Sequence, residues 1–250
     1  MPVLETRDLS VRFGGQAAVD RVSCAFHPGT LTAIVGPNGA GKTTYFNLLS
    51  GQLRASAGEI LLGGRRITAL PAPRRARLGI GRAFQLTSLF PALSVLENVR
   101  LAVRPAADGP GFFALAEDDT ARTDRAMACL GQVRLAGRAG APAAALGHGD
   151  QRKLEIAMLL AMDPAIFLFD EPTAGMSVDE VPVLLDLIAG IRDDARRTIL
   201  LVEHKMDVVR RLADRVVVLH QGALVADGPP AEMVASAIVQ EAYLGVRPAA

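Results

Sequence analysis

The feature that most constrains the fold of this chain is a glycine-rich stretch, GPNGAGKTT, at residues 36–44. It lies between the apolar run Leu31–Val35, typical of a buried strand, and the helical pattern Lys42–Ser50. Glycines at this spacing let backbone N–H groups turn inward around phosphate oxygens, and the start of the helix adds the positive end of its dipole. A strand, this loop and a helix in succession therefore predict a phosphate-binding site in an α/β fold.

Two side chains of the stretch have roles that the spacing predicts. Lys42 can reach the β- and γ-phosphates of a nucleotide, and the hydroxyl of Thr43 can hold Mg²⁺. The other expected contacts to the nucleotide are the rest of the stretch: Gly36, Pro37, Asn38, Gly39, Ala40, Gly41 and Thr44. We therefore expect a nucleotide and Mg²⁺ as cofactors.

A second apolar run, 166–169, ends in two carboxylates, Asp170 and Glu171. An aspartate at the end of a strand can hold Mg²⁺ through water. Its neighbour points in another direction, where it can orient or deprotonate an attacking water. The alternative, a solvated strand end, leaves the preceding apolar run unexplained, so we interpret the pair as a metal ligand and a base.

Three further residues are weak signals when each is taken alone. Gln85 follows a strand pattern at 80–84, His204 follows another strand, and Phe13 lies beside a Gly-Gly turn. Taken alone, a glutamine at a strand end is usually a solvated amide, a histidine there is more often structural than catalytic, and a phenylalanine more often belongs to the core. Both strands, however, would end at the same edge of a parallel sheet as the glycine-rich loop, where ligands of such sheets bind.

Short apolar runs alternate with helical patterns, which indicates βαβ units around a mostly parallel sheet. The apolar runs 3–7, 11–13 and 22–26 predict antiparallel strands, and 215–228 predicts a hairpin that turns at Gln221-Gly222. We expect one α/β domain with a mixed sheet and helices on both faces. Its expected parts are a nucleotide-binding core at 1–85 and 163–228 that includes the N-terminal antiparallel β subdomain, an inserted helical subdomain at 86–162, and a helical tail at 229–250.

Several helix boundaries can be predicted as well. Ser94 and Glu97 form one capping box, and Ser177 and Glu180 form another at the start of a helix over 178–193. One apolar helix face is expected at four positions: Leu154, Ala157, Met158 and Ala161.

A net charge of +1 and two widely separated cysteines restrict the function classes. A nearly neutral chain has no global field that draws it to nucleic acid or anionic lipid. Cys24 and Cys129 lack metal-like spacing and predict buried thiols in a reducing compartment. No apolar run approaches the ~20 residues that span a bilayer, and the N-terminus has no signal-peptide pattern. We expect a cytosolic chain with no nucleic-acid partner, whose membrane role depends on other subunits.

In their order, these features resemble the ATP-binding-cassette (ABC) ATPases, whose core is that of the P-loop NTPases. The order is Phe13, the loop at 36–44, Gln85, the segment LGHGD at 146–150, Asp170-Glu171 and His204. The resemblance covers nearly the whole chain, from residue 3 to about residue 228. It implies an ATPase with ATP and Mg²⁺ as cofactors.

The resemblance also implies individual roles. Phe13 would stack on adenine, Gln85 would touch Mg²⁺ or the attacking water, and His204 would contact the γ-phosphate. Asp170 would support Mg²⁺, and Glu171 would be the catalytic base. Two cassettes of this family enclose two ATP molecules, and a signature segment of the opposite cassette completes each site. Here that contribution in trans would come from Gly147, His148, Gly149 and Asp150.

Two positions depart from the family pattern. The commonest signature is LSGGQ, so LGHGD lacks the serine hydroxyl at Gly147. His148 either offsets the lost hydrogen bond or acts only as a spacer. Ser177 stands where many members carry aspartate, and it serves either as a helix cap or as a contact across the dimer.

Finer marks resemble the ATPases of importers of the branched-chain amino-acid type. They are RAFQ at 82–85, HGDQRKLEI at 148–156, PTAGM at 172–176, VEHKM at 202–206 and QEAYLG at 240–245. This resemblance implies a bacterial-type subunit that is peripheral at the cytoplasmic face of the plasma membrane. Its implied partners are transmembrane permease subunits, a second ATPase subunit in a homo- or heterodimer, and a periplasmic or extracellular substrate-binding protein. Urea, an amide or another small organic solute is the alternative cargo, because a cassette never touches the transported molecule.

Other classes account for fewer of these features. A P-loop kinase would leave Gln85, the signature segment and His204 without a role. Cassette proteins of DNA repair and translation carry long coiled coils or tandem cassettes, and this sequence has neither heptads nor a second cassette. An exporter subunit is the remaining alternative.

Overall fold

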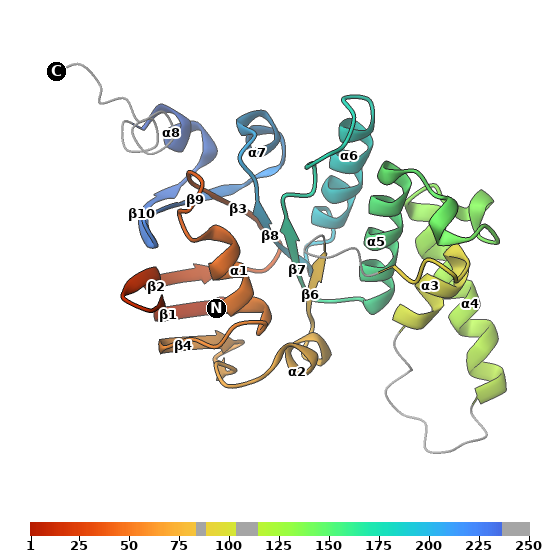
Figure 1. The fold of residues 1–250 in the computed structure, drawn as a ribbon, viewed down its shortest axis with the longest axis horizontal. Coiled ribbons are helices and arrows are strands. Elements are labelled where there is room, and N and C mark those ends of the chain that lie inside the picture. Colours follow the sequence, from red (N-terminus) through yellow and green to blue (C-terminus); the bar gives the residue numbers. More distant parts are fainter. Residues whose placement is uncertain (84–88, 104–114, 237–250) are drawn as a thin grey trace. The chain divides into compact units, whose positions relative to one another are not determined.

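The computed structural model describes residues 1–83, 89–103 and 115–236, and the chain divides into two compact units. The first unit contains Met1–Arg82, Ala165–Glu171 and the chain from Ile188 onward. The second unit contains Ala83–Pro164 and Pro172–Leu187. Figure 1 labels their helices and strands.

The first unit begins with an antiparallel sheet in the order β2-β1-β4-β5. Its strands are β1 (Leu4–Phe13), β2 (Gln16–Phe26), β4 (Ala57–Leu62) and β5 (Arg65–Arg66), and they lie together in Figure 1. The predicted antiparallel strands are confirmed, with the turn at Gly14-Gly15. The strands are longer than the three predicted runs, because register shifts between β1 and β2 let β1 continue through its polar positions.

The second sheet of this unit has the strand order β10-β9-β3-β8-β7-β6. Its strands are β3 (Leu31–Val35), β6 (Ile80–Ala83), β7 (Ile166–Asp170), β8 (Thr198–Val202), β9 (Arg215–His220) and β10 (Ala223–Gly228). Parallel pairs join β3 to β8 and β9, and β7 to β8, whereas β10 is antiparallel to β9. The predicted mixed sheet and its closing hairpin are confirmed. Every position of β3, β7 and β8 is buried, as expected for strands covered on both faces.

Helices cover both faces of this mixed sheet. Ile34 packs into an apolar cluster with Tyr45 and Phe46 of α1 (Lys42–Ser50). Its neighbours on the strand point the other way, where Val35 packs with Val209 of α7 (Met206–Leu212). Shorter helices of the same unit are α2 (Ala72–Arg77) and α8 (Pro230–Ala235). The fold class predicted from the sequence is confirmed.

A buried arginine, Arg75, fixes α2 to the end of α1. Its side chain is 1% exposed, and burial lowers its pKa to about 10. Its guanidinium donates to four backbone carbonyl groups: those of Leu48, Leu49, Thr68 and Leu70. Arg75 therefore satisfies carbonyls that the end of α1 leaves without helical partners.

The second unit is built from helices. They are α3 (Val95–Ala102), α4 (Leu115–Gln132), α5 (His148–Met162) and the short 3₁₀ helices η1 (Ala136–Arg138) and η2 (Ala143–Ala145). The capping box at the start of α3 is confirmed, since Ser94 Oγ accepts the Glu97 N–H and the Glu97 carboxylate accepts the Ser94 N–H. In α5 the predicted apolar face is largely buried, but Ile156 and Leu159 are buried too, so α5 is covered on more than one side.

The helix predicted over 178–193 begins later than expected, because α6 spans Glu180–Arg192. The Glu180 carboxylate accepts the backbone N–H of Ser177 at 3.0 Å, which is one half of the predicted capping box. Both cysteines are buried, as predicted. Among the described residues, no helix combines the length and the apolar composition needed to cross a membrane.

Candidate functional site

The glycine-rich loop joins β3 to α1 in the first unit, as its sequence predicts. Gly36 has φ 151°, and a Cβ there would lie 2.1 Å from the carbonyl oxygen of Leu219. Gly41 has φ 97°, and a Cβ there would lie 2.3 Å from the carbonyl oxygen of Ala18. Gly41 is also the N-cap of α1, with no side chain capping the first turn. The loop therefore depends on glycine to leave the N-terminal N–H groups of α1 available to an anion.

Lys42 is held inside this loop. Its side chain is largely buried, and Nζ donates to the carbonyl oxygens of Gly36 at 2.6 Å and Pro37 at 3.0 Å. Burial lowers the pKa of Lys42, and the charges of Glu171 and Asp170 oppose that shift. An ammonium has three donors, so Lys42 can keep both carbonyls and still contact a phosphate.

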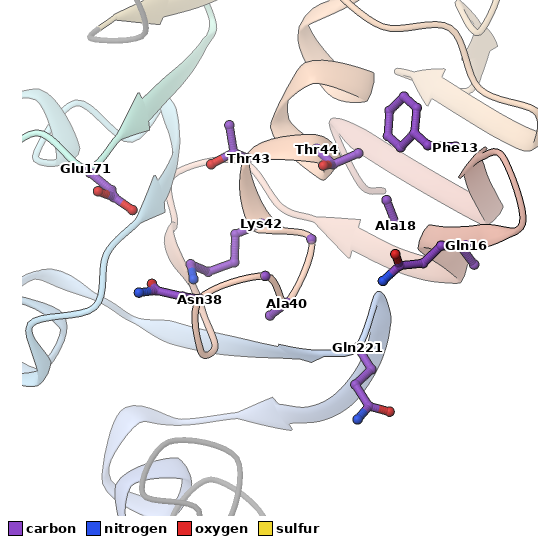
Figure 2. Close-up of a pocket in the computed structure, with 13 residues that line it drawn as sticks. Phe13, Gln16, Ala18, Asn38, Ala40, Lys42, Thr43, Thr44, Glu171 and Gln221 are labelled. Carbon is purple, nitrogen blue, oxygen red and sulfur yellow. The ribbon is translucent and has the colours of Figure 1, made fainter.

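A cavity of roughly 800 Å³ opens over the loop, and its volume suits a nucleotide. The loop contributes Asn38, Gly39, Ala40, Gly41, Lys42, Thr43 and Thr44 to the lining. Phe13, which is 54% exposed, forms one wall, and Figure 2 shows it across the cavity from Glu171, with Lys42 between them. An exposed aromatic side chain beside a phosphate loop provides a stacking surface for a base.

Gln16 and Gln221 also line the cavity, although the sequence patterns do not mark them as site residues. Gln16 begins β2 just after the turn that follows Phe13, and Gln221 lies in the turn between β9 and β10. The adjacent Gly222 donates its N–H to the Ala40 carbonyl at 3.0 Å, which holds this turn against the loop. In the sequence, the only sign of a role for these residues is that they are polar and lie in or beside a tight turn.

The two carboxylates at the end of β7 point in different directions, as predicted. Asp170 is 8% exposed, and its Oδ2 accepts a hydrogen bond from Arg82 at 2.6 Å. Glu171 lines the cavity and has φ 48°, a left-handed conformation that is rare for a residue with a side chain. Its N–H donates to the Val202 carbonyl at 2.9 Å, which helps to hold this strained conformation.

His204 lies next to Glu171. Its Nδ1 is 3.6 Å from Glu171 Oε1, and both side chains are partly exposed. The turn that carries His204 is fixed by the buried Glu203, whose carboxylate accepts the N–H groups of His204 at 3.0 Å and Lys205 at 3.2 Å. The structure thus brings together a carboxylate and an imidazole that the sequence separates by more than thirty residues.

The donor groups suit Mg²⁺. The Thr43 hydroxyl and the Asp170 carboxylate are hard oxygen ligands, the kind that Mg²⁺ prefers. The described part of the chain has no cluster of three or more His, Cys, Asp or Glu side chains able to bind a metal. Mg²⁺ is usually held by few protein groups together with phosphate oxygens and water. Gln85, the other predicted ligand, lies outside the described residues.

In the second unit, the predicted signature segment forms the start of α5. This helix begins at His148, and Gly147 is its N-cap. Gly147 is exposed, and no heavy atom lies within 4 Å of the place its Cβ would take. Gly149 is buried, and a Cβ there would lie 1.9 Å from a Glu180 carboxylate oxygen. The missing side chain at Gly149 therefore makes room for Glu180 within this unit.

Comparisons with known sequences agree with this geometry. The family model described as "ABC transporter" matches residues 19–174. The chain is 38% identical to the high-affinity branched-chain amino acid transport ATP-binding protein LivG of Escherichia coli (strain K12), over 98% of both chains. It is also 38% identical, over 98% of both chains, to BraF of Pseudomonas aeruginosa, which carries the same description.

Solved structures agree as well. A nucleotide-free ATP-binding cassette from an ABC transporter matches with a TM-score of 0.83 at 26% identity, over 98% of this chain and 100% of that chain. The ADP conformation of an ATP-binding cassette of an ABC transporter matches with a TM-score of 0.83 at 25% identity, again over 98% of this chain and 100% of that chain.

Proposed function

This chain belongs to the ABC transporter family, and we propose that it hydrolyses ATP to power the import of branched-chain amino acids. The observation that carries the proposal is the cavity in which Phe13, the phosphate loop and Glu171 face one another. We divide the chain as the sequence suggests, with an ATP-binding core at 1–85 and 163–228, a helical subdomain at 86–162 and a tail at 229–250.

The site residues bind successive parts of the nucleotide along the cavity. Phe13 stacks on adenine, and the loop at 36–44 surrounds the phosphates with N–H groups and the Lys42 ammonium. Thr43, Asp170 and Gln85 would hold Mg²⁺, which would supply positive charge to neutralise the phosphates.

Glu171, which lines the cavity, and His204 beside it act on the γ-phosphate. The Glu171 carboxylate orients the attacking water and accepts its proton, while His204, 3.6 Å away, contacts the γ-phosphate. Little covalent chemistry is required of the protein, so most of the rate enhancement comes from position and charge.

We propose that a second cassette, identical or related, completes each site. Gly147, His148, Gly149 and Asp150 would face the γ-phosphate bound by that partner, with the N-terminus of α5 directed at the anion. The dimer would attach to transmembrane permease subunits at the cytoplasmic face of the membrane and receive cargo from a substrate-binding protein outside.

The missing serine hydroxyl of the signature segment gives a direct test of this arrangement. Gly147→Ser should tighten ATP-dependent dimerisation by about 10- to 100-fold, because a hydrogen bond to a charged acceptor contributes about 1.5–3 kcal/mol. The space around Gly147 admits the side chain. Analytical ultracentrifugation of a hydrolysis-deficient background with ATP measures the dimer dissociation constant.

Gly147→Ala is the matched control, since it adds the Cβ without the hydroxyl. A serine at an N-cap also stabilises its own helix by a few tenths of a kcal/mol relative to glycine. If thermal stability rises slightly in Gly147→Ser but dimerisation is unchanged, the segment is an ordinary helix start rather than a phosphate contact.

Coupling to transport is tested with the partners present. The ATPase rate of this chain should rise several-fold on assembly with its permease and a leucine-loaded binding protein. The binding protein and this chain would lie on opposite sides of the membrane, so the signal between them can pass only through the permease. Rates with the same binding protein free of ligand, and with urea or an amide offered instead, separate the possible cargoes. A rate that stays at its basal value with every loaded binding protein argues against import.

A further inference from the structure

Arg82 occupies an unusual position at the end of β6. Its side chain is 7% exposed, and one terminal nitrogen donates to Asp170 Oδ2 at 2.6 Å. The other donates to Asn47 Oδ1 at 2.7 Å, Ser50 Oγ at 3.1 Å and Gln52 Oε1 at 2.9 Å. One buried guanidinium therefore links β6 to the end of β7 and to α1.

The acceptors on α1 belong to the helix face that also carries a metal-site residue. Thr43, Asn47 and Ser50 are spaced i, i+4 and i+7, so they follow one face of α1. The guanidinium also lies 5.6 Å from the centre of the Phe46 ring. Arg82 thus contacts both elements that present predicted Mg²⁺ ligands, α1 with Thr43 and β7 with Asp170.

A buried ion pair is an expensive way to obtain stability, because removing two charges from water offsets much of their attraction. Burial lowers the pKa of Arg82, which reflects that penalty, although the hydrogen bond to Asp170 opposes the shift. A guanidinium holds its donors in a fixed plane, so it imposes an orientation that a flexible ammonium does not. This fixed geometry, rather than charge alone, suits a guanidinium that binds four acceptors: two on α1, Gln52 just after it, and Asp170 at the end of β7.

We propose that Arg82 is a positioning residue that orients the Asp170 carboxylate toward Mg²⁺ and keeps it in register with Thr43. The hydrogen bond from Arg82 to Oδ2 restrains rotation of the carboxylate, which would leave Oδ1 available to Mg²⁺ or to its water shell. This inference rests on the proposed role of Asp170 as a metal-supporting residue.

The test measures how much Mg²⁺ strengthens the binding of a non-hydrolysable ATP analogue, as the ratio of dissociation constants in EDTA and in Mg²⁺. Arg82→Lys should lower that ratio about tenfold while leaving the constant in EDTA nearly unchanged, because the phosphate loop is not altered. Asn47→Ala removes one support of Arg82 but keeps the ion pair, so it should lower the ratio by a smaller factor.

Arg75→Lys is the matched control. Arg75 of α2 is also a buried arginine that contacts the end of α1, but all four of its hydrogen bonds go to backbone carbonyls. It should lower the melting temperature and leave the Mg²⁺ ratio at its wild-type value. If Arg82→Lys lowers stability but not the ratio, as Arg75→Lys does, Arg82 is structural and the inference is overturned.

Asp170→Asn separates this inference from the proposed function. A normal ratio in Asp170→Asn would overturn both the metal role of Asp170 and the inference that depends on it. A reduced ratio in Asp170→Asn together with a normal ratio in Arg82→Lys and Asn47→Ala would overturn the inference alone.

Discussion

Glu171→Gln should reduce ATP turnover by about 10²-fold or more while ATP still binds, because the amide cannot accept the proton of the attacking water. Glutamine has nearly the same shape, and the backbone bond from residue 171 to the Val202 carbonyl does not involve the side chain. ATP bound without hydrolysis should then hold two cassettes together. Steady-state phosphate release and size-exclusion chromatography with ATP measure the two effects.

A suitable control is Glu59→Gln, which neutralises a partly exposed carboxylate of the same unit that pairs with Arg66 outside the cavity. It should leave turnover and nucleotide affinity unchanged. Turnover of Glu171→Gln close to the wild-type rate would show that another group accepts the proton, with His204 as the nearest candidate at 3.6 Å.

The sequence predicts best where local chemistry decides the structure. The helix at Lys42–Ser50 and the strand at Leu31–Val35 have the predicted bounds. In both elements a glycine sets the boundary, because it adopts a positive φ that other residues disfavour: Gly36 follows the strand, and Gly41 precedes the helix. The order of motifs along the chain then identifies the family.

Boundaries that depend on distant side chains are predicted less well. The start of α6 differs from the sequence pattern even though half of its predicted local capping box forms: the Glu180 carboxylate accepts the N–H of Ser177, but the helix begins only at Glu180. The pairing of Arg82 with Asp170 joins residues 88 positions apart, and neither residue type announces it. Nothing in the local sequence predicts the left-handed conformation of Glu171, which the bond to Val202 on a neighbouring strand supports.

Lys42→Ala should weaken the binding of ATP and ADP by at least about 10- to 100-fold, since a hydrogen bond to a charged group contributes about 1.5–3 kcal/mol and each 1.4 kcal/mol is tenfold in affinity. The Lys42 ammonium is the positive charge that the loop encloses, held by the carbonyl groups of Gly36 and Pro37. Its removal takes away both the contact to the phosphates and the counter-charge to Asp170 and Glu171. Equilibrium titration with a fluorescent nucleotide measures the change.

Lys42→Met separates the charge from the side-chain stem, because methionine fills similar space without an ammonium. It should bind nucleotide as weakly as Lys42→Ala but retain more of the packing in the loop, so its melting temperature should be the higher of the two. Melting temperatures also exclude unfolding as the cause of lost binding. Affinity within threefold of wild type in both variants would mean that the N–H groups of the loop and of α1 bind the phosphates without Lys42, and the role assigned to this residue would be wrong.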